Sequence, residues 1–173
     1  MKTLGLVGWS GAGKTTLLIK LLPILAQRGM SVSTMKHAHH AFDIDKEGKD
    51  SYLHRQAGAK EVLIASKKRW ALMHEYEEEE EETTAQHLLR KMSPVDLVLI
   101  EGFKSESHPK LEVHRRELGK PLLADKDPNI IAIITDQPFL PSNRPILSLE
   151  KLQEIADFVC DFCADRTGVS WHN

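Results

Sequence analysis

The chain of 173 residues lacks most features of secreted, membrane-spanning and nucleic-acid-binding proteins. Its two cysteines are too few for a disulfide framework, so a reducing cytoplasmic setting is expected. No apolar run approaches the roughly 18 residues that cross a membrane, and no export signal is recognisable. The 23 basic and 25 acidic residues give a net charge of −2, without the basic excess typical of nucleic-acid binders. We therefore expect neither a membrane nor nucleic acid among the partners.

Short apolar segments alternate with amphipathic ones along most of the chain. Buried strands are expected at residues 3–7, 31–36, 95–100, 111–115 and 130–135. Helices are expected at residues 14–28, with Pro23 inside, and at residues 50–57 and 149–164. A hairpin is expected from residues 61–66 and 70–75, and a helix capped by Thr83 or Thr84 and reaching Lys91. This alternation predicts an α/β protein, with a mostly parallel central sheet flanked by helices.

The segment GWSGAGKTT, residues 8–16, fits the phosphate-loop pattern G-x-x-x-x-G-K-[ST] between a predicted strand and a predicted helix. Small residues let backbone N–H groups curl around phosphate oxygens, and the helix that begins near Gly13 adds its positive end. Lys14 can reach the β- and γ-phosphates, and the Thr15 hydroxyl can ligate Mg²⁺. We expect one P-loop NTPase domain over residues 1–173, with a nucleotide bound by Ser10, Gly11, Ala12, Gly13, Lys14, Thr15 and Thr16.

A P-loop also needs a carboxylate at the end of a neighbouring strand to hold Mg²⁺, and the segment VDLVLIEGFK supplies one. Residues 97–100 carry the chain through the core, and Glu101 follows where the strand ends. Asp96 lies at the opposite end of the strand, away from the phosphates. Glu101 is therefore the candidate metal residue and, with Lys14, the candidate for any catalysis. A solvated carboxylate that only ends the strand is the alternative.

The sequence motif for recognition of the nucleotide base is weaker than the phosphate-loop motif. Guanine-specific P-loop proteins commonly carry N/T-K-x-D after a late strand, with the aspartate pairing to N1 and N2 of guanine. The segment AIITDQP offers Thr135 and Asp136 at this place, without the lysine that packs on the ring. A turn that ends the strand, helped by Pro138, is the competing interpretation.

The segment MKHAHHAFDIDKEGKDS, residues 35–51, contains three histidines, three aspartates, a glutamate and three lysines. It resembles the start of an EF-hand loop, but His54 stands where the closing glutamate belongs. A transition-metal site at His37, His39 and His40 lacks a nearby thiolate, and Cys160 and Cys163 fit packing on one helix face better than ligation. Because the segment leaves a strand at the rim that carries the phosphate loop, it is better read as a wall of the phosphate site. Lys36 and His37 would then meet anions, Asp45 or Asp50 could hold a magnesium-bound water, and a solvated loop is the alternative.

Taken together, these segments resemble the family of molybdopterin-guanine dinucleotide biosynthesis protein B, MobB. The similarity covers nearly the whole chain through GWSGAGKTT, MKHAHHAFDIDKEGKDSYLHRQAGA, LVLIEGFK and HPKLEVHR, with ASKKRWALMHE in addition. The block K-H-x-H-H…D-x-D…G-K-D-S is far more specific than a phosphate loop alone.

The resemblance implies a GTP-binding protein with weak, Mg²⁺-dependent GTPase activity, usually a homodimer. It implies an adaptor for the enzyme that attaches GMP to molybdopterin, so the expected partners are this molybdopterin guanylyltransferase and molybdopterin itself. It also places two groups at the nucleotide site: Gly102, Phe103 and Lys104 beside Glu101, and residues 45–51 with Asp45, Asp50 and Ser51.

Two other functions remain open. A small-molecule or nucleoside kinase needs an acceptor pocket under an Arg-rich lid, whereas the basic residues here are scattered. A metallochaperone GTPase is suggested only by the three histidines. No residue that orients the attacking water and no arginine finger is evident from the sequence, which agrees with slow hydrolysis. The acidic run at residues 77–82 is expected to be a solvated loop.

Overall fold

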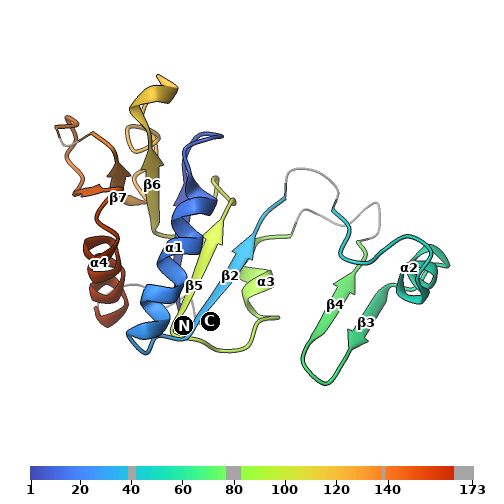
Figure 1. Ribbon diagram of the computed structural model, residues 1–173. Coiled ribbons are helices and arrows are strands. Elements are labelled where there is room, and N and C mark those ends of the chain that lie inside the picture. The colour runs from blue at the N-terminus through green and yellow to red at the C-terminus, as the bar shows by residue number, and fades with distance from the viewer. Residues whose placement is uncertain (39–41, 77–82, 138, 166–173) are drawn as a thin grey trace. The chain divides into compact units, whose positions relative to one another are not determined.

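The structure, a computed structural model, describes residues 1–38, 42–76, 83–137 and 139–165 (Figure 1). The chain divides into two compact units, each considered by itself below. The first unit comprises residues 1–37 and 84–173, and the second comprises residues 38–83. In the described part of the chain, no helix is both long and apolar enough to cross a membrane.

A six-stranded sheet forms the centre of the first unit. Its strand order is β2-β5-β1-β6-β7-β8, and every neighbouring pair is parallel. The strands are β1 (Lys2–Val7), β2 (Val32–Lys36), β5 (Leu97–Glu101), β6 (Lys110–His114), β7 (Ile130–Thr135) and β8 (Ile146–Ser148). Because β1 lies between β5 and β6, the segment that follows β1 is flanked by the ends of both strands. The predicted α/β class and parallel sheet are confirmed.

Two helices, α1 (Lys14–Gln27) and α4 (Leu152–Ala164), cover one face of this sheet (Figure 1). Helix α1 repeats leucine at Leu17, Leu21 and Leu25, so one stripe of the helix is buried against leucine and valine side chains of the strands. Pro23 lies inside α1, as predicted. We call this side of the sheet the helical face.

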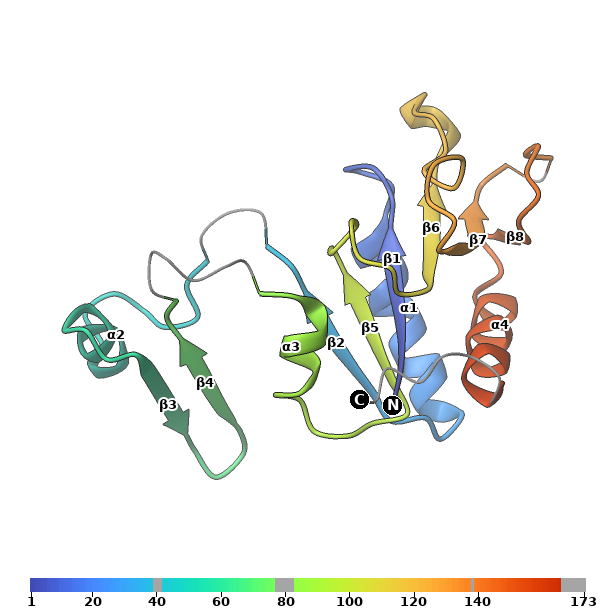
Figure 2. The ribbon, with the colours of Figure 1, turned by 180° about the vertical axis from the view of Figure 1, so that it is seen from behind.

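On the opposite face of the sheet, different elements cover different strands. Figure 2 shows α3 (Ala85–Leu89) in front of β2 and β5, where Val98 and Ile100 form a small apolar cluster with Ala85. Thr84 caps α3 by accepting a hydrogen bond from His87 N at 3.2 Å, as the sequence predicted.

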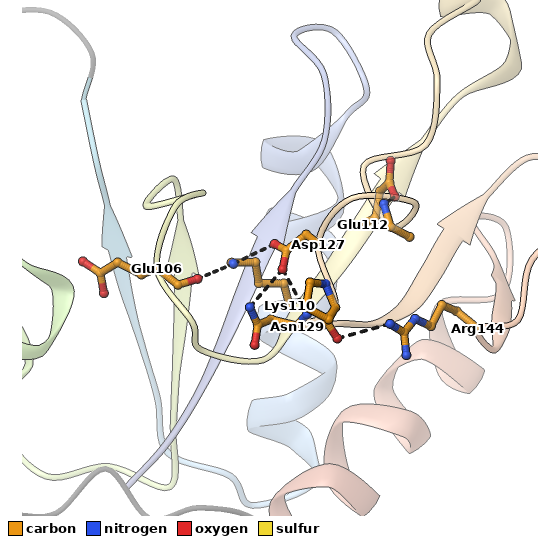
Figure 3. Close-up of polar contacts among 8 residues, drawn as sticks. Glu106, Lys110, Glu112, Asp127, Asn129 and Arg144 are labelled. Atoms are coloured by element: carbon orange, nitrogen blue, oxygen red, sulfur yellow. Dashed lines mark hydrogen bonds and ion pairs between the residues drawn. The ribbon is translucent and has the colours of Figure 1, made fainter.

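Strand β6 buries a row of polar side chains on this second face. Lys110, Glu112 and His114 alternate with Leu111 and Val113, which point to the helical face. The Glu112 carboxylate accepts hydrogen bonds from two backbone amides, at residues 123 and 124, both at 2.8 Å. Figure 3 shows the Lys110 ammonium between the Asp127 carboxylate, 2.8 Å away, and the carbonyl oxygen of Glu106. The row therefore attaches the segment that follows β6 to the sheet.

The second unit contains α2 (Asp50–Gln56) and an antiparallel hairpin of β3 (Glu61–Ala65) and β4 (Trp70–His74). Helix α2 packs against β3. The hairpin matches the expectation from the sequence.

Several boundaries were predicted wrongly. Helix α3 ends at Leu89 rather than reaching Lys91, and β5 begins at Leu97 rather than at residue 95. The last helix begins at Leu152 rather than at residue 149, because residues 146–148 form β8, a strand that the sequence did not reveal. Leu149 continues the backbone pairing of that strand, since its amide donates to the carbonyl of Thr135 at 3.0 Å.

Candidate functional site

The phosphate loop connects β1 to α1 and depends on glycines with left-handed backbone angles. Gly11 and Gly13 have φ of 81° and 92°, and Gly13 is the N-cap of α1. A Cβ atom at Gly8 would lie 2.3 Å from the carbonyl oxygen of Val113 in β6, so no other residue fits this position. Ser10, Gly11, Thr15 and Thr16 are exposed, whereas Ala12 is fully buried.

Lys14 bends back over this loop. Its ammonium donates hydrogen bonds to the carbonyl oxygens of Gly8 at 2.9 Å and Trp9 at 3.2 Å. Burial lowers the pKa of the Lys14 ammonium below its ordinary value; Glu101 opposes this effect, and the charges of Lys104 and Lys36 add to it. Three ammonium groups thus act on one another beside the loop, an arrangement that favours a polyanion.

Glu101 lies where the sequence predicted the metal carboxylate. It ends β5, next to Leu6 of β1 on one side and Lys36 of β2 on the other. The Thr15 hydroxyl donates to the two carboxylate oxygens of Glu101, at 3.1 and 3.4 Å. A hydroxyl and a carboxylate are the oxygen donors that Mg²⁺ takes beside nucleotide phosphates, so these residues fit the ion.

The turn after Glu101 packs on His37. Gly102 has a φ of 106°, and a Cβ atom there would lie 2.6 Å from the Cβ atom of His37. Phe103 also has a positive φ of 47°, and its ring centroid lies 4.5 Å from that of the His37 imidazole. The His37 amide donates to the carbonyl of Glu101 at 2.8 Å. Lys36, His37 and residues 101–104 therefore lie on one side of the phosphate loop, and their contact with a bound nucleotide stays a prediction.

The other side of the loop carries a residue that the sequence did not single out. Arg115 follows β6, and its Nε atom donates to the carbonyl oxygen of Ala12 at 3.3 Å. Its Nη1 atom lies 3.9 Å from the Asp136 carboxylate, which also accepts a hydrogen bond from the amide of Arg116 at 3.1 Å. Arg115 is the last residue of the segment HPKLEVHR. Its place beside the phosphate loop could not be read from that segment, because it depends on β6 pairing with β1.

Three predicted site residues belong to the second unit. The Asp45 side chain is buried and forms an ion pair with Arg55 at 3.0 Å, and Asp43 contacts the same guanidinium at 2.9 Å. Asp50 and Ser51 begin α2. Since the two units are described separately, a role for Asp45, Asp50 and Ser51 at the nucleotide remains a prediction.

The metal interpretation finds no support in the described residues, where no three His, Cys, Asp or Glu side chains gather to hold an ion. His39, His40, Pro138 and the acidic run at residues 77–82 lie outside that part of the chain. Cys160 and Cys163 lie on α4, and burial raises the pKa of the Cys163 thiol to about 11. Both cysteine side chains pack against the apolar core under the helical face.

Comparison with known proteins decides the family. The sequence pattern of molybdopterin guanine dinucleotide synthesis protein B, MobB, matches residues 3–136. The chain belongs to the MobB family. A relative from Haemophilus influenzae, named molybdopterin-guanine dinucleotide biosynthesis adapter protein, is 44% identical over 90% of this chain and 86% of its own length. A relative of the same name from Escherichia coli is 42% identical over 95% of each chain.

Solved MobB structures share the fold. A crystal structure of a MobB homologue from Bacillus stearothermophilus has a TM-score of 0.72 at 26% identity, covering 96% of this chain and 100% of that one. The predicted P-loop NTPase fold is thereby confirmed. The MobB pattern ends at Asp136, so both sides of the phosphate loop described above lie within it.

Proposed function

We propose that this MobB chain is a GTP-binding adaptor in the formation of molybdopterin guanine dinucleotide, working in the cytoplasm with slow, Mg²⁺-dependent GTP hydrolysis. The observation that carries the proposal is the arrangement of Lys14, Thr15 and Glu101 at the phosphate loop. The lysine is next to the loop carbonyls, and the hydroxyl and carboxylate contact each other at 3.1 Å. This arrangement supplies the charge and the oxygen ligands for a magnesium-bound triphosphate.

Titration with fluorescently labelled GTP and ATP, with and without Mg²⁺, tests this proposal. Lys14→Ala should lose nucleotide binding while the fold survives, because the side chain contacts the loop from a half-buried position. Lys20→Ala, which removes an exposed lysine of the same helix, is the matched control and should bind as the wild type does. Equal GTP affinity in wild type and Lys14→Ala would refute the assigned role.

The metal role of Thr15 and Glu101 can be tested separately. Thr15→Val and Glu101→Gln should reduce the Mg²⁺-dependent gain in GTP affinity, whereas binding measured with EDTA should change little. An unchanged magnesium effect in both variants would remove these residues from the metal site.

The proposed partner is the enzyme that joins GMP to molybdopterin, with molybdopterin as a further ligand. The names of the relatives support an adapter role in this pathway. Addition of the wild-type chain to that enzyme, molybdopterin and GTP should increase dinucleotide formation. Lys14→Ala should not increase it, because the adaptor would enter the reaction without nucleotide.

We also propose that the chain is a homodimer that uses the hairpin of the second unit. Leu63 and Leu72 pair across β3 and β4 on one face, and their exposed fractions are 61% and 44%. Trp70, on the same face, is 65% exposed. A two-stranded hairpin with an open apolar face gains stability by covering that face. Leu63→Glu should convert the dimer to a monomer in sedimentation analysis; a wild-type monomer would contradict the proposal.

A further inference from the structure

The base-recognition segment after β7 lacks the lysine that guanine-specific loops place on the ring. Only Thr135 and Asp136 of that pattern are present, and Thr135 is buried against His114. A cation for the face of the base must therefore come from elsewhere in the fold. The neighbouring strand β6 ends in Arg115, at the same edge of the sheet.

Two contacts place the Arg115 guanidinium between the phosphate loop and Asp136. Its Nε atom is 3.3 Å from the Ala12 carbonyl oxygen. Its Nε and Nη2 atoms would be 3.5 Å from a Cβ atom at Gly13, so the group lies directly against the loop. Its Nη1 atom points to the Asp136 carboxylate, 3.9 Å away. The Arg115 side chain is 34% exposed, so it is not sealed from a ligand.

The two carboxylate oxygens of Asp136 have different neighbours, and only one of them accepts a hydrogen bond within the described part of the chain. Its Oδ1 atom accepts the backbone amide of Arg116 at 3.1 Å, and Oδ2 is the atom that faces Arg115. The Asp136 side chain is 33% exposed. A carboxylate can accept two parallel N–H bonds from N1 and N2 of guanine, whereas adenine presents no such pair of donors on that edge.

The chain after Arg115 closes this side of the loop. The Leu118 side chain is 3.6 Å from where a Cβ atom at Gly11 would lie. The Trp9 indole donates to the Pro121 carbonyl at 2.8 Å, and the Lys120 ammonium lies 5.6 Å from the Trp9 ring centroid. The ends of β6 and β7 thus lie on the side of the loop opposite Glu101 and the magnesium ligands.

We propose that Arg115 replaces the missing lysine: its guanidinium packs on the purine ring of the bound nucleotide while Asp136 reads the guanine edge. The proposal rests on the proposed nucleotide binding and assigns the base subsite within it. A planar guanidinium stacks on aromatic rings more readily than an ammonium does, so arginine suits this position. The base is then held by residues from two strands rather than by one contiguous motif.

Binding of GTP, ATP, XTP and inorganic tripolyphosphate to four proteins tests the proposal. Arg115→Ala should weaken GTP about 10- to 100-fold and leave tripolyphosphate unchanged. Asp136→Asn should weaken GTP by a similar factor and strengthen XTP, because asparagine offers an N–H to the C2 carbonyl of xanthine. Arg116→Ala removes an exposed arginine one position later and should match the wild type.

Other results would overturn the assignment. Equal losses of GTP and tripolyphosphate in Arg115→Ala would place the guanidinium on a phosphate instead. Unchanged base preference in Asp136→Asn would exclude Asp136 as the reader while nucleotide binding itself stands. Failure of wild type to bind either GTP or tripolyphosphate would instead refute the proposed function and this inference together. If Arg115→Ala does not fold, Arg115→Gln decides the question, because its side-chain amide can still donate to the Ala12 carbonyl while the guanidinium is gone.

Discussion

Removal of Asp127 should destabilise the protein much more than removal of an equally short ion pair at the surface. The Lys110 ammonium lies 2.8 Å from the Asp127 carboxylate, and the Lys110 side chain is only 1% exposed. Within the residues that the structure describes, Asp127→Ala leaves this charge buried with only the Glu106 carbonyl as its partner. Deleting one member of a buried pair costs roughly 3–5 kcal/mol of unfolding free energy. Since Asp127 itself is 23% exposed, we expect about 3 kcal/mol, the lower end.

Lys151 and Glu154 provide the matched control. Their charged atoms are also 2.8 Å apart, but the side chains are 61% and 54% exposed. Glu154→Ala should leave the free energy of unfolding nearly unchanged, because water already solvates both charges. Urea unfolding followed by circular dichroism measures both variants, with the comparison made at an unchanged m-value.

The complementary variant separates charge from packing. Lys110→Met keeps the buried stem without the charge, so it should cost less than Asp127→Ala, about 1 kcal/mol. The remaining Asp127 carboxylate still accepts hydrogen bonds from the amide and side chain of Asn129. Equal losses for Asp127→Ala and Glu154→Ala would refute the argument from burial. A greater loss for Lys110→Met than for Asp127→Ala would show that packing dominates.

Two further changes follow from strained or buried groups. Gly102→Ala adds a Cβ atom 2.6 Å from His37 at a φ of 106°, so it should cost about 2 kcal/mol in urea unfolding and weaken GTP; wild-type values would contradict this contact. Burial and the charge of Lys110 lower the pKa of His108 from 6.5 to about 4. The unfolded chain therefore binds this proton more readily, and the unfolding free energy should fall by up to about 3 kcal/mol as pH drops from 6.5 to 4. His108→Asn should flatten this dependence, and an unchanged pH profile would exclude His108 as its source.

The phosphate side of the site was predictable because its signals are local. The glycines of residues 8–13 predict a loop between a strand and a helix, and Lys14 and Thr15 follow directly in the sequence. Glu101 could be placed because a carboxylate at the end of a buried apolar run must lie at the rim of a parallel sheet. A glycine follows Glu101 because a Cβ atom at position 102 would lie too close to the side chain of His37.

The rest depended on strand order, which no local pattern encodes. Arg115 has no motif of its own, and it reaches Ala12 only because β6 pairs with β1. The three residues of β8 are half-buried and too few for a periodic signal, so the last helix was extended over part of that region. Alternating polarity alone would place Lys110 and Glu112 at the surface, whereas the segment at residues 116–129 covers them.

The alternation of polar and apolar side chains along β6 also disfavours a shifted register between β6 and its neighbouring strands. A slip of one residue would turn Lys110, Glu112 and His114 toward α1 and α4, where the buried side chains of the described core cluster are apolar. Leu111 and Val113 would at the same time lose their apolar neighbours. Because each misaligned charge would be costly to bury, the polar row makes one alignment of β6 far more stable than its neighbours. The same residues that attach a loop thereby determine how the centre of the sheet assembles.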